Sequence, residues 1–323
     1  MSEVQGQGLV GLTEIESAAR RLQGVAVRTP LLPADAVSEA VGAEVFLKCE
    51  NLQRAGAFKI RGAFNFVSQL SDDQVKNGII TYSSGNHAQA VALTGRLRGI
   101  RAVVVMPTTA PRVKVDGTKR LGGEVILEGT TSVQRKVRAE AIAEEEGLVM
   151  VPPFDHRHII AGAGTVGLEI AKDCPDVDFV LAPIGGGGLA SGVAAAIKRL
   201  LPSAQVIGVE PAGAASMRAA LDHGAPILLE KTGSVADGLM TMMAGELTFE
   251  HAKALMDDVV TVSDDAIREA TKLLMSRHKL VVEFSGAATT AALLESMVDV
   301  KGGRVAVVIS GGNLDPSFLS QLA

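Results

Sequence analysis

Short apolar segments alternate with longer amphipathic segments along most of the chain. The apolar segments are rich in Val and Ile: residues 78–82 read GIITY, 102–106 read AVVVM and 179–184 read FVLAPI. Such runs are typical of strands that are buried on both faces of a parallel sheet. The segments between them repeat their apolar residues at helical spacing. The alternation predicts right-handed βαβ units, and therefore an α/β fold with mostly parallel sheets.

The expected elements follow one another without a long linker. Thr13 is expected to cap the first helix, and Ser263 with Asp264 a later one, because these side chains can accept hydrogen bonds from free N–H groups. Pro152 and Pro153 interrupt the alternation and mark the best candidate boundary between two parts. The predicted strands are 44–49, 78–82, 102–106, 124–127, 148–151, 179–184, 205–210, 258–262 and 304–309. The predicted helices are 13–22, 34–41, 60–70, one ending near Arg98, 113–121, 132–146, 164–173, 189–201, 217–223, 265–277 and 286–296.

Composition excludes several classes of function. Of the 323 residues 47% are hydrophobic, but only 3% are aromatic and none is Trp, so Val, Ile, Leu and Ala must form the core. The net charge is −5 and no basic stripe occurs, which argues against a nucleic-acid partner. Cys49 and Cys174 lack metal-ligand spacing and are expected to be reduced. The N-terminus does not resemble a signal peptide, and no apolar run approaches the roughly 20 residues that span a membrane. We therefore expect a soluble, cytoplasmic protein.

Lys59 stands out within the stretch NLQRAGAFKIRGA at 51–63, because Phe58 and Ile60 flank it. A lysine between apolar neighbours is either a surface residue of an edge strand or an amine held for chemistry. A crowded amine has a lowered pKa, and its neutral form can attack a carbonyl to form a Schiff base. An amine that captures an aldehyde beside a loop that captures a phosphate is what pyridoxal phosphate (PLP) requires.

Four successive glycines at 185–188 lie between a predicted strand and a predicted helix. Glycine lets backbone amides close on a phosphate, and the helix N-terminus adds a favourable dipole. A tight strand-to-helix turn is the simpler interpretation. Gly185, Gly187 and Ala190 also fit a dinucleotide-binding fingerprint, with Glu210 where a ribose-binding acid would lie. That alternative leaves Lys59 without a role.

Two further loops have polar sequences that suit ligand binding. SSGNH at 83–87 follows a strand and begins a helix, so its hydroxyls and free amides can bind a carboxylate. An ordinary N-cap is the competing interpretation, although one Ser or Asn would suffice for it. SGGN at 310–313 follows the last strand and by itself favours a plain turn. A Ser-His-Asp hydrolase is not supported, because no G-x-S-x-G motif occurs.

Taken together, these stretches resemble the fold type II PLP-dependent enzymes, in particular the serine/threonine dehydratase and serine racemase group. The matching residues are FKIRGA at 58–63, SSGNHAQA at 83–90, GGGGLASG at 185–192, VADG at 235–238 and SGGN at 310–313. They occur in the family's order and cover nearly the whole chain. The resemblance makes the dinucleotide-dependent oxidoreductase a remote alternative.

The resemblance implies a tryptophan synthase β-like architecture of two lobes, each with a mostly parallel, twisted sheet flanked by helices. Residues 1–52 and 152–323 would form a large PLP-binding domain, and 53–151 an inserted small domain. Only ten residues follow Asn313, so a C-terminal regulatory domain is not expected. A homodimer or higher homo-oligomer is expected from the resemblance alone.

The resemblance also assigns roles to residues. Lys59 would bind the cofactor aldehyde and act as the base at the substrate's Cα, and Ser84 would lie where racemases place a second acid/base. The other cofactor-binding residues would be Phe58, Asn86, Gly185, Gly186, Gly187, Gly188, Leu189 and Ser310. The substrate-binding residues would be Ser83, Ser84, Asn86, His87 and Thr241. A Mg²⁺ or other cation site would comprise Glu210, the carbonyl of Ala214 and Ser216, where the family has an acid.

The function implied is an ammonia-lyase that converts L-threonine or L-serine to a 2-keto acid and ammonia by α,β-elimination. A neutral Ser310 cannot keep a pyridine nitrogen protonated as a carboxylate would, which favours prompt loss of the β-substituent. The alternatives within the class are a serine- or aspartate-type racemase that uses Lys59 and Ser84, and a dehydratase for 3-hydroxyaspartate or another β-hydroxy amino acid.

Overall fold

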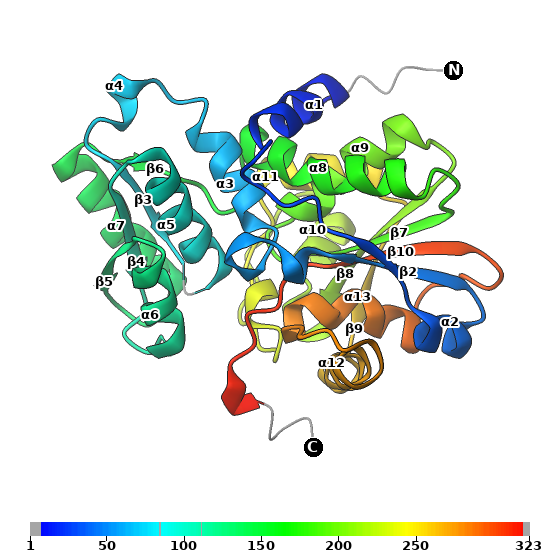
Figure 1. Ribbon diagram of the computed structural model, residues 1–323. Coiled ribbons are helices and arrows are strands. Elements are labelled where there is room, and N and C mark those ends of the chain that lie inside the picture. The colour runs from blue at the N-terminus through cyan, green and yellow to red at the C-terminus, as the bar shows by residue number, and fades with distance from the viewer. Residues whose placement is uncertain (1–7, 84, 111, 319–323) are drawn as a thin grey trace.

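The computed structural model describes residues 8–83, 85–110 and 112–318, and it contains two sheets side by side (Figure 1). The larger sheet has six strands in the order β1-β2-β10-β7-β8-β9, and only the β1–β2 pair is antiparallel. The smaller sheet has four parallel strands in the order β5-β4-β3-β6. The strands of the larger sheet are β1 (Leu31–Pro33), β2 (Glu44–Cys49), β7 (Phe179–Pro183), β8 (Gln205–Pro211), β9 (Asp258–Val262) and β10 (Arg304–Ile309). Those of the smaller sheet are β3 (Ile79–Tyr82), β4 (Ala102–Met106), β5 (Glu124–Leu127) and β6 (Val149–Met150).

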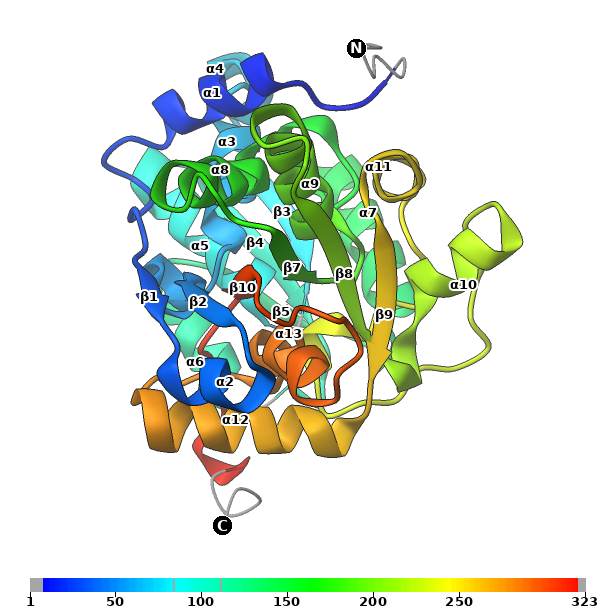
Figure 2. The same ribbon diagram turned by 90° about the vertical axis from the view of Figure 1, so that its right-hand side faces the viewer.

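Helices cover both faces of the larger sheet. Alternate residues of β10 show the two sides: Val305 and Val307 pack with α12 and α13, whereas Ala306 packs with α8 and α9. Figure 2 shows α8, α9 and α11 on one side and α2, α12 and α13 on the other. The helices of this lobe are α1 (Leu12–Arg21), α2 (Asp35–Val41), α8 (Arg157–Asp173), α9 (Gly188–Leu200), α10 (Ser216–His223), α11 (Glu246–Leu255), α12 (Asp264–His278) and α13 (Phe284–Leu294).

The smaller sheet has its own helical layers, with α5 on one face and α7 on the other. Ile79 packs with the α3–α5 side, and Ile80 packs with α7 on the opposite side. The helices of this lobe are α3 (Lys59–Val67), α4 (Asp72–Val75), α5 (Asn86–Arg98), α6 (Arg112–Arg120) and α7 (Ser132–Glu146). The mostly parallel α/β fold with two flanked sheets is therefore confirmed. The domain boundaries near 53 and 151 stay a prediction.

Several local predictions were wrong. Thr13 lies inside α1, whose N-cap is Gly11, and Glu14 accepts a hydrogen bond from the Gly11 amide at 2.9 Å. Helix α8 begins at Arg157 and not near 164, because its glycines are packing positions and not a loop. A Cβ on Gly162 would lie 2.4 Å from the carbonyl oxygen of Arg61 on α3. Helices α4 and α11 were not predicted. The cap at Ser263 is confirmed, since its hydroxyl accepts from the Ala266 amide at 3.1 Å.

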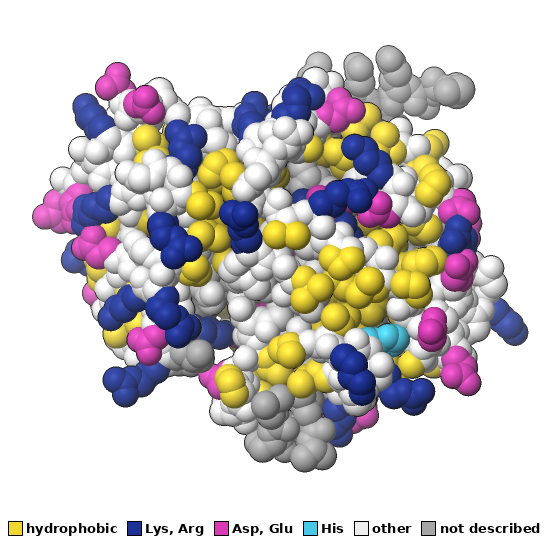
Figure 3. All heavy atoms as spheres, viewed as in Figure 1, with side chains coloured by type: hydrophobic (Ala, Val, Ile, Leu, Met, Phe, Trp, Pro, Cys, Tyr) yellow, Lys and Arg dark blue, Asp and Glu magenta, His cyan; other side chains and the backbone are white. Residues whose placement is uncertain are grey.

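The outer surface differs between the two lobes. On the face of Figure 3, hydrophobic side chains gather over the centre and the right, whereas Lys and Arg are frequent on the left, over the smaller sheet. No helix in the described part of the chain is both long enough and apolar enough to cross a bilayer. Both cysteines are buried and free, as predicted for reduced residues.

Candidate active site

Lys59 begins α3, directly after a bridge that pairs Ala57 with Gly311 at the end of β10. Its Nζ donates to the carbonyl oxygen of Pro153 at 2.8 Å and lies 5.1 Å from the centre of the Phe58 ring. Burial lowers the pKa of the Lys59 amine to about 8. No carboxylate of a described residue forms an ion pair with it. A substantial fraction of this amine is therefore neutral near physiological pH, as a nucleophile requires.

The glycine loop at 185–188 connects β7 to α9. Gly187 has φ +93°, a conformation that favours glycine, and a Cβ on Gly186 would lie 2.2 Å from the ring of Phe154. The Thr248 hydroxyl donates to the Gly186 carbonyl at 2.7 Å and holds the loop. The free amides at the start of α9 make the loop a suitable anion cradle.

The loop after β3 begins α5 and carries the second group of predicted residues. The Gly85 amide donates to the Ser83 hydroxyl at 3.3 Å, and Ser84 lies outside the described residues. His87 is buried, and its Nε2 donates to the Val151 carbonyl at 3.1 Å. Burial, and secondarily the Lys59 charge, lowers the pKa of His87 to about 3. His87 is therefore neutral, and its role in binding a carboxylate stays a prediction.

The Asn86 amide is fixed from both ends. Its Nδ2 donates to Glu283 Oε1 at 2.6 Å, and its Oδ1 accepts from Asn313 Nδ2 at 2.8 Å. Asn313 also donates to the Ala55 carbonyl at 2.8 Å. Burial raises the pKa of Glu283 to about 7, and the Asp237 carboxylate adds to the effect. These contacts leave the second Nδ2 proton of Asn86 for a ligand in the pocket.

These residues meet in one cavity of about 170 Å³ between the lobes. Of the predicted residues, Phe58, Lys59, Ser83, Asn86, His87, Gly186, Thr241 and Ser310 line it. Gly185, Gly187 and Gly188 belong to the same loop without lining the cavity, and Leu189 packs in the core. The other lining residues are Gly85, Lys114, Pro153, Phe154, Asp237, Gly238, Leu239, Glu283 and Ser285.

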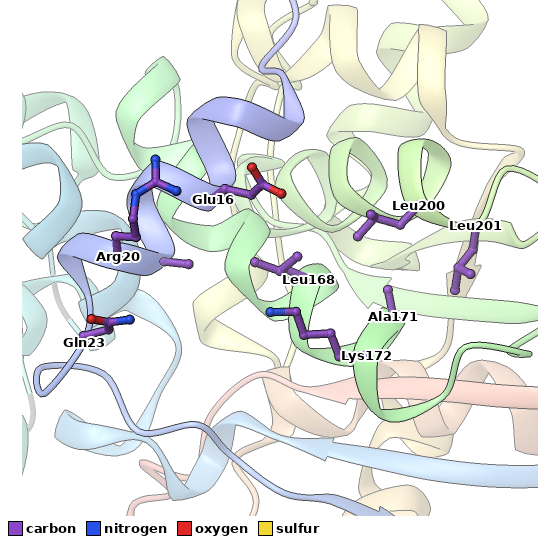
Figure 4. Close-up of a pocket in the computed structure, with 9 residues that line it drawn as sticks. Glu16, Arg20, Gln23, Leu168, Ala171, Lys172, Leu200 and Leu201 are labelled. Carbon is purple, nitrogen blue, oxygen red and sulfur yellow. The ribbon is translucent and has the colours of Figure 1, made fainter.

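A larger hollow of about 580 Å³ lies on the outer side of α1, α8 and α9. Figure 4 shows Glu16 and Arg20 on α1, Leu168 and Lys172 on α8, and Leu200 at the end of α9. None of the motif residues lines it. A buried amine with a shifted pKa, an anion cradle and convergent polar groups identify an active site better than volume does, and they occur in the smaller cavity.

Glu210, the acid of the predicted cation site, already accepts hydrogen bonds from the protein backbone. Both oxygens of the Glu210 carboxylate accept hydrogen bonds at 2.8 Å, one from the amide of Met217 and one from that of Arg218. Glu210 thus caps α10 from outside the helix. The described residues contain no cluster of three His, Cys, Asp or Glu side chains that could hold a metal. Ala214 and Ser216 flank this helix start, and a cation there stays a prediction.

Sequence reasoning missed several residues of the cavity. Glu283 gave a signal, because it is a lone acid within the apolar run LVVEF, and Asp237 lies within the VADG stretch, to which the sequence assigns no role. Phe154 gave only its position after the proline pair. The sequence contains no signal for Lys114, because it is one of several basic residues on an amphipathic helix.

Comparison with known proteins agrees with this geometry. Residues 22–311 match the family model described as pyridoxal-phosphate dependent enzyme. The chain therefore belongs to the PLP-dependent enzyme family. It is 44% identical to an L-threonine ammonia-lyase of Thermotoga maritima, over 97% of this chain and 78% of the relative. It is 40% identical to a serine racemase of Schizosaccharomyces pombe, over 95% and 97%. Maize serine racemase is similar in structure, with a TM-score of 0.93, 39% identity and coverage of 97% and 96%.

The residues present fit the cofactor of this family. The buried Lys59 amine lines the cavity, and Gly186 has no Cβ to obstruct the glycine loop. Ser310, a residue that is only 4% exposed, provides a hydroxyl in the same cavity. The relatives divide between ammonia-lyases and racemases. Family membership thus establishes a PLP-dependent enzyme of the threonine/serine dehydratase or serine racemase type.

Proposed function

We propose that this enzyme is an ammonia-lyase that releases ammonia and a 2-keto acid from L-threonine or L-serine. The observation that carries the proposal is Lys59, a buried amine with no carboxylate partner in the described part of the chain, in one cavity with the serine loop and the glycine loop. The similarity to L-threonine ammonia-lyase supports the same activity.

The residues have complementary tasks in this proposal. When bound, PLP withdraws electrons from the substrate's α-carbon and so acidifies its proton. The amides of the glycine loop would hold the phosphate, and the Asn86 Nδ2 would donate to the ring hydroxyl. Lys59 would bind the aldehyde and then, once displaced by the substrate amine, take the α-proton. Ser83 and neighbouring amides would hold the substrate carboxylate.

Ser310 suits loss of a β-substituent. Its hydroxyl lines the cavity and cannot supply the negative charge that keeps a pyridine nitrogen protonated. Negative charge at the α-carbon would then be drawn less strongly into the ring, so the electron pair would be more available to expel the β-substituent. The hydroxyl still needs a proton to leave, because hydroxide is a poor leaving group.

A substrate panel tests the proposal. Ammonia and 2-keto acid release is measured with L-threonine, L-serine, threo-3-hydroxyaspartate, phenylserine and their D-isomers. We expect release from L-threonine or L-serine, its loss in Lys59→Ala, and its retention in Lys172→Ala, which removes an exposed lysine. Holoenzyme that releases nothing from any of these substrates would contradict the proposal.

An amino-acid racemase is the second candidate, because serine racemases are among the most similar relatives. A racemase needs an acid/base on each face of the α-carbon, and Lys59 and Ser84 would be the pair. Ser84→Ala should then abolish exchange between enantiomers while sparing elimination from the L-isomer. Racemisation that persists in Ser84→Ala would exclude Ser84 as the second base.

A further inference from the structure

An ion pair joins the two lobes at the cavity. Lys114 lies on α6 beside the smaller sheet, and Asp237 begins the short 3₁₀ helix Asp237–Leu239 of the larger lobe. The Lys114 Nζ contacts the Asp237 carboxylate, and both side chains line the cavity. The Lys114 side chain is only 13% exposed. The Asp237 side chain is 49% exposed, so the lysine amine is shielded at the cavity wall while its partner reaches solvent.

The segment that carries Asp237 is fixed on the larger lobe. The Gly238 amide donates to the Ser285 hydroxyl at 2.9 Å, and the Asp237 amide donates to the Val235 carbonyl at 2.9 Å. Lys114 also approaches the loop that begins α5, since a Cβ built on Gly85 would lie 3.9 Å from its Nζ. The lysine amine thus lies between Asp237 and the loop proposed to receive the substrate carboxylate.

A second carboxyl group reinforces the negative side of this wall. Glu283 lines the same cavity, is 5% exposed and lies within electrostatic reach of both partners. Burial and then the Asp237 charge raise the pKa of Glu283, whereas Lys114 opposes that effect. Asp237 thus balances the Lys114 charge before any substrate enters, and the partly ionised Glu283 adds negative charge near neutral pH.

We propose that Asp237 is a specificity residue: it neutralises Lys114 and thereby restricts this lyase to amino acids with an uncharged β-substituent. The inference rests on the proposed function. A substrate with a second carboxylate needs an uncompensated cation, and Lys59 and Lys114 are the cationic side chains among the described residues of the cavity wall. Lys59 is committed to the cofactor and the α-proton. Lys114 is committed to Asp237.

The substitution Asp237→Asn keeps the size of the side chain and removes the charge. Among the described residues, Lys114 then has no carboxylate within ion-pair distance, although Glu283 stays nearby, so it can pair with a second substrate carboxylate. We expect the ratio of kcat/KM for threo-3-hydroxyaspartate to that for L-threonine to rise about tenfold or more, the effect of one freed charge at close range. Adding Lys114→Met to Asp237→Asn should cancel the gain, because the gained interaction is with that lysine.

The experiment compares holoenzymes of the wild type, Asp237→Asn, Asp237→Asn with Lys114→Met, and a control. The control is Glu124→Gln, which removes one acid from an exposed ion pair with Arg101 and changes net charge equally. It should leave the ratio unchanged. An ion pair that merely held the lobes together predicts instead that Asp237→Asn lowers both activities in proportion, and that outcome would overturn the proposal.

A binding measurement separates this inference from the proposed function. L-Aspartate has no β-hydroxyl to lose, so its binding is followed by the change it causes in the cofactor's absorption, with L-alanine as the neutral reference. Asp237→Asn should bind L-aspartate about tenfold more tightly relative to L-alanine, and the double variant should not. Absence of elimination in every variant would refute the lyase. The aspartate titration would still decide the charge preference, and unchanged relative affinity would refute it.

Discussion

Lys59 and Arg61 lie two residues apart at the start of α3, yet their surroundings are opposite. The Arg61 guanidinium contacts Glu50 at 2.7 Å, Glu169 at 2.7 Å and Thr165 at 3.0 Å. Burial alone would lower the pKa of Arg61, but the two carboxylates outweigh it and raise that pKa. Lys59 donates to the Pro153 carbonyl and pairs with no carboxylate of a described residue, so burial lowers its pKa. A buried cation that has carboxylate partners stays charged and stabilises the fold. A buried amine that lacks them has a lowered pKa and becomes reactive.

Two buried glutamates repeat the contrast. Burial tends to raise the pKa of Glu50, but Arg61 and the Thr29 hydroxyl bond to it and lower its pKa overall. Glu283 has an amide partner, Asn86, and no guanidinium, and its pKa is raised to about 7. The network beneath α3 and the wall of the cavity are thus built from the same residue types. They differ in whether each charge is compensated.

The largest expected effect is on activity. Lys59→Ala should lower kcat/KM with L-threonine about 10²–10⁴-fold or more, because it removes the proton acceptor at the α-carbon. It should not lower the free energy of unfolding of the apoprotein, since burying the amine costs free energy and no described carboxylate compensates its charge. Steady-state kinetics and denaturant unfolding measure the two effects. If Lys59→Ala lowered the free energy of unfolding but kept its kcat/KM, Lys59 would have the structural role assigned here to Arg61.

Arg61→Ala should affect stability most. It leaves Glu50 buried without its cation, which costs about 3–5 kcal/mol. Arg101→Ala is the matched control, since Arg101 also contacts two carboxylates, Glu124 at 2.8 Å and Glu146 at 2.5 Å, but is 42% exposed. That pair of contacts should contribute about 0–1 kcal/mol. Equal losses in urea unfolding would show that burial does not distinguish the two networks.

The pH dependence of stability should depend on Glu283. Its pKa is raised from an ordinary 4.5 to about 7, so between these values the folded state binds more protons than the unfolded state. The free energy of unfolding then falls as pH rises through this window, by about 1–3 kcal/mol. Burial also raises the pKa of Glu210 to about 7, so Glu210 contributes a fall of its own. Glu283→Gln should therefore reduce the total fall, whereas Glu140→Gln on the exposed face of α7 should leave it unchanged. Unfolding of the apoproteins at pH 5 and pH 8 measures the difference. Parallel pH profiles would mean that Glu283 is paired in solution.

The smallest effect concerns one hydrogen bond of the network. Thr165→Val removes the hydroxyl that accepts from Arg61 and donates to the Gly162 carbonyl at 2.7 Å. Because the two carboxylates remain, the expected loss of unfolding free energy is about 1 kcal/mol. Denaturation midpoints of the two variants measure the difference. A loss as large as that of Arg61→Ala would mean that the Thr165 hydroxyl, and not the charged groups, stabilises the network.

The features that could be predicted from the sequence are those that depend on the local pattern of residues. Strands β4 and β10 follow from short Val-rich apolar runs. Asn86 and Ser310 belong to motifs that directly follow strands, and Lys59 is indicated by its apolar neighbours. The start of α8 was missed because Gly162 lies where two helices pack closely. From the sequence alone, such a glycine cannot be distinguished from a glycine in a loop. Lys114 was missed because only the fold brings it to Asp237, more than a hundred residues away.

The most direct measurement identifies the lysine that holds the cofactor. Holoenzyme is reduced with borohydride, digested, and the modified peptide sequenced by mass spectrometry. We predict the label on Lys59, the buried amine for which no described residue provides an ion-pair partner, and none on Lys48, which contacts Glu169 at 2.6 Å. A label on Lys48 or Lys114, or no reducible adduct at all, would contradict this prediction.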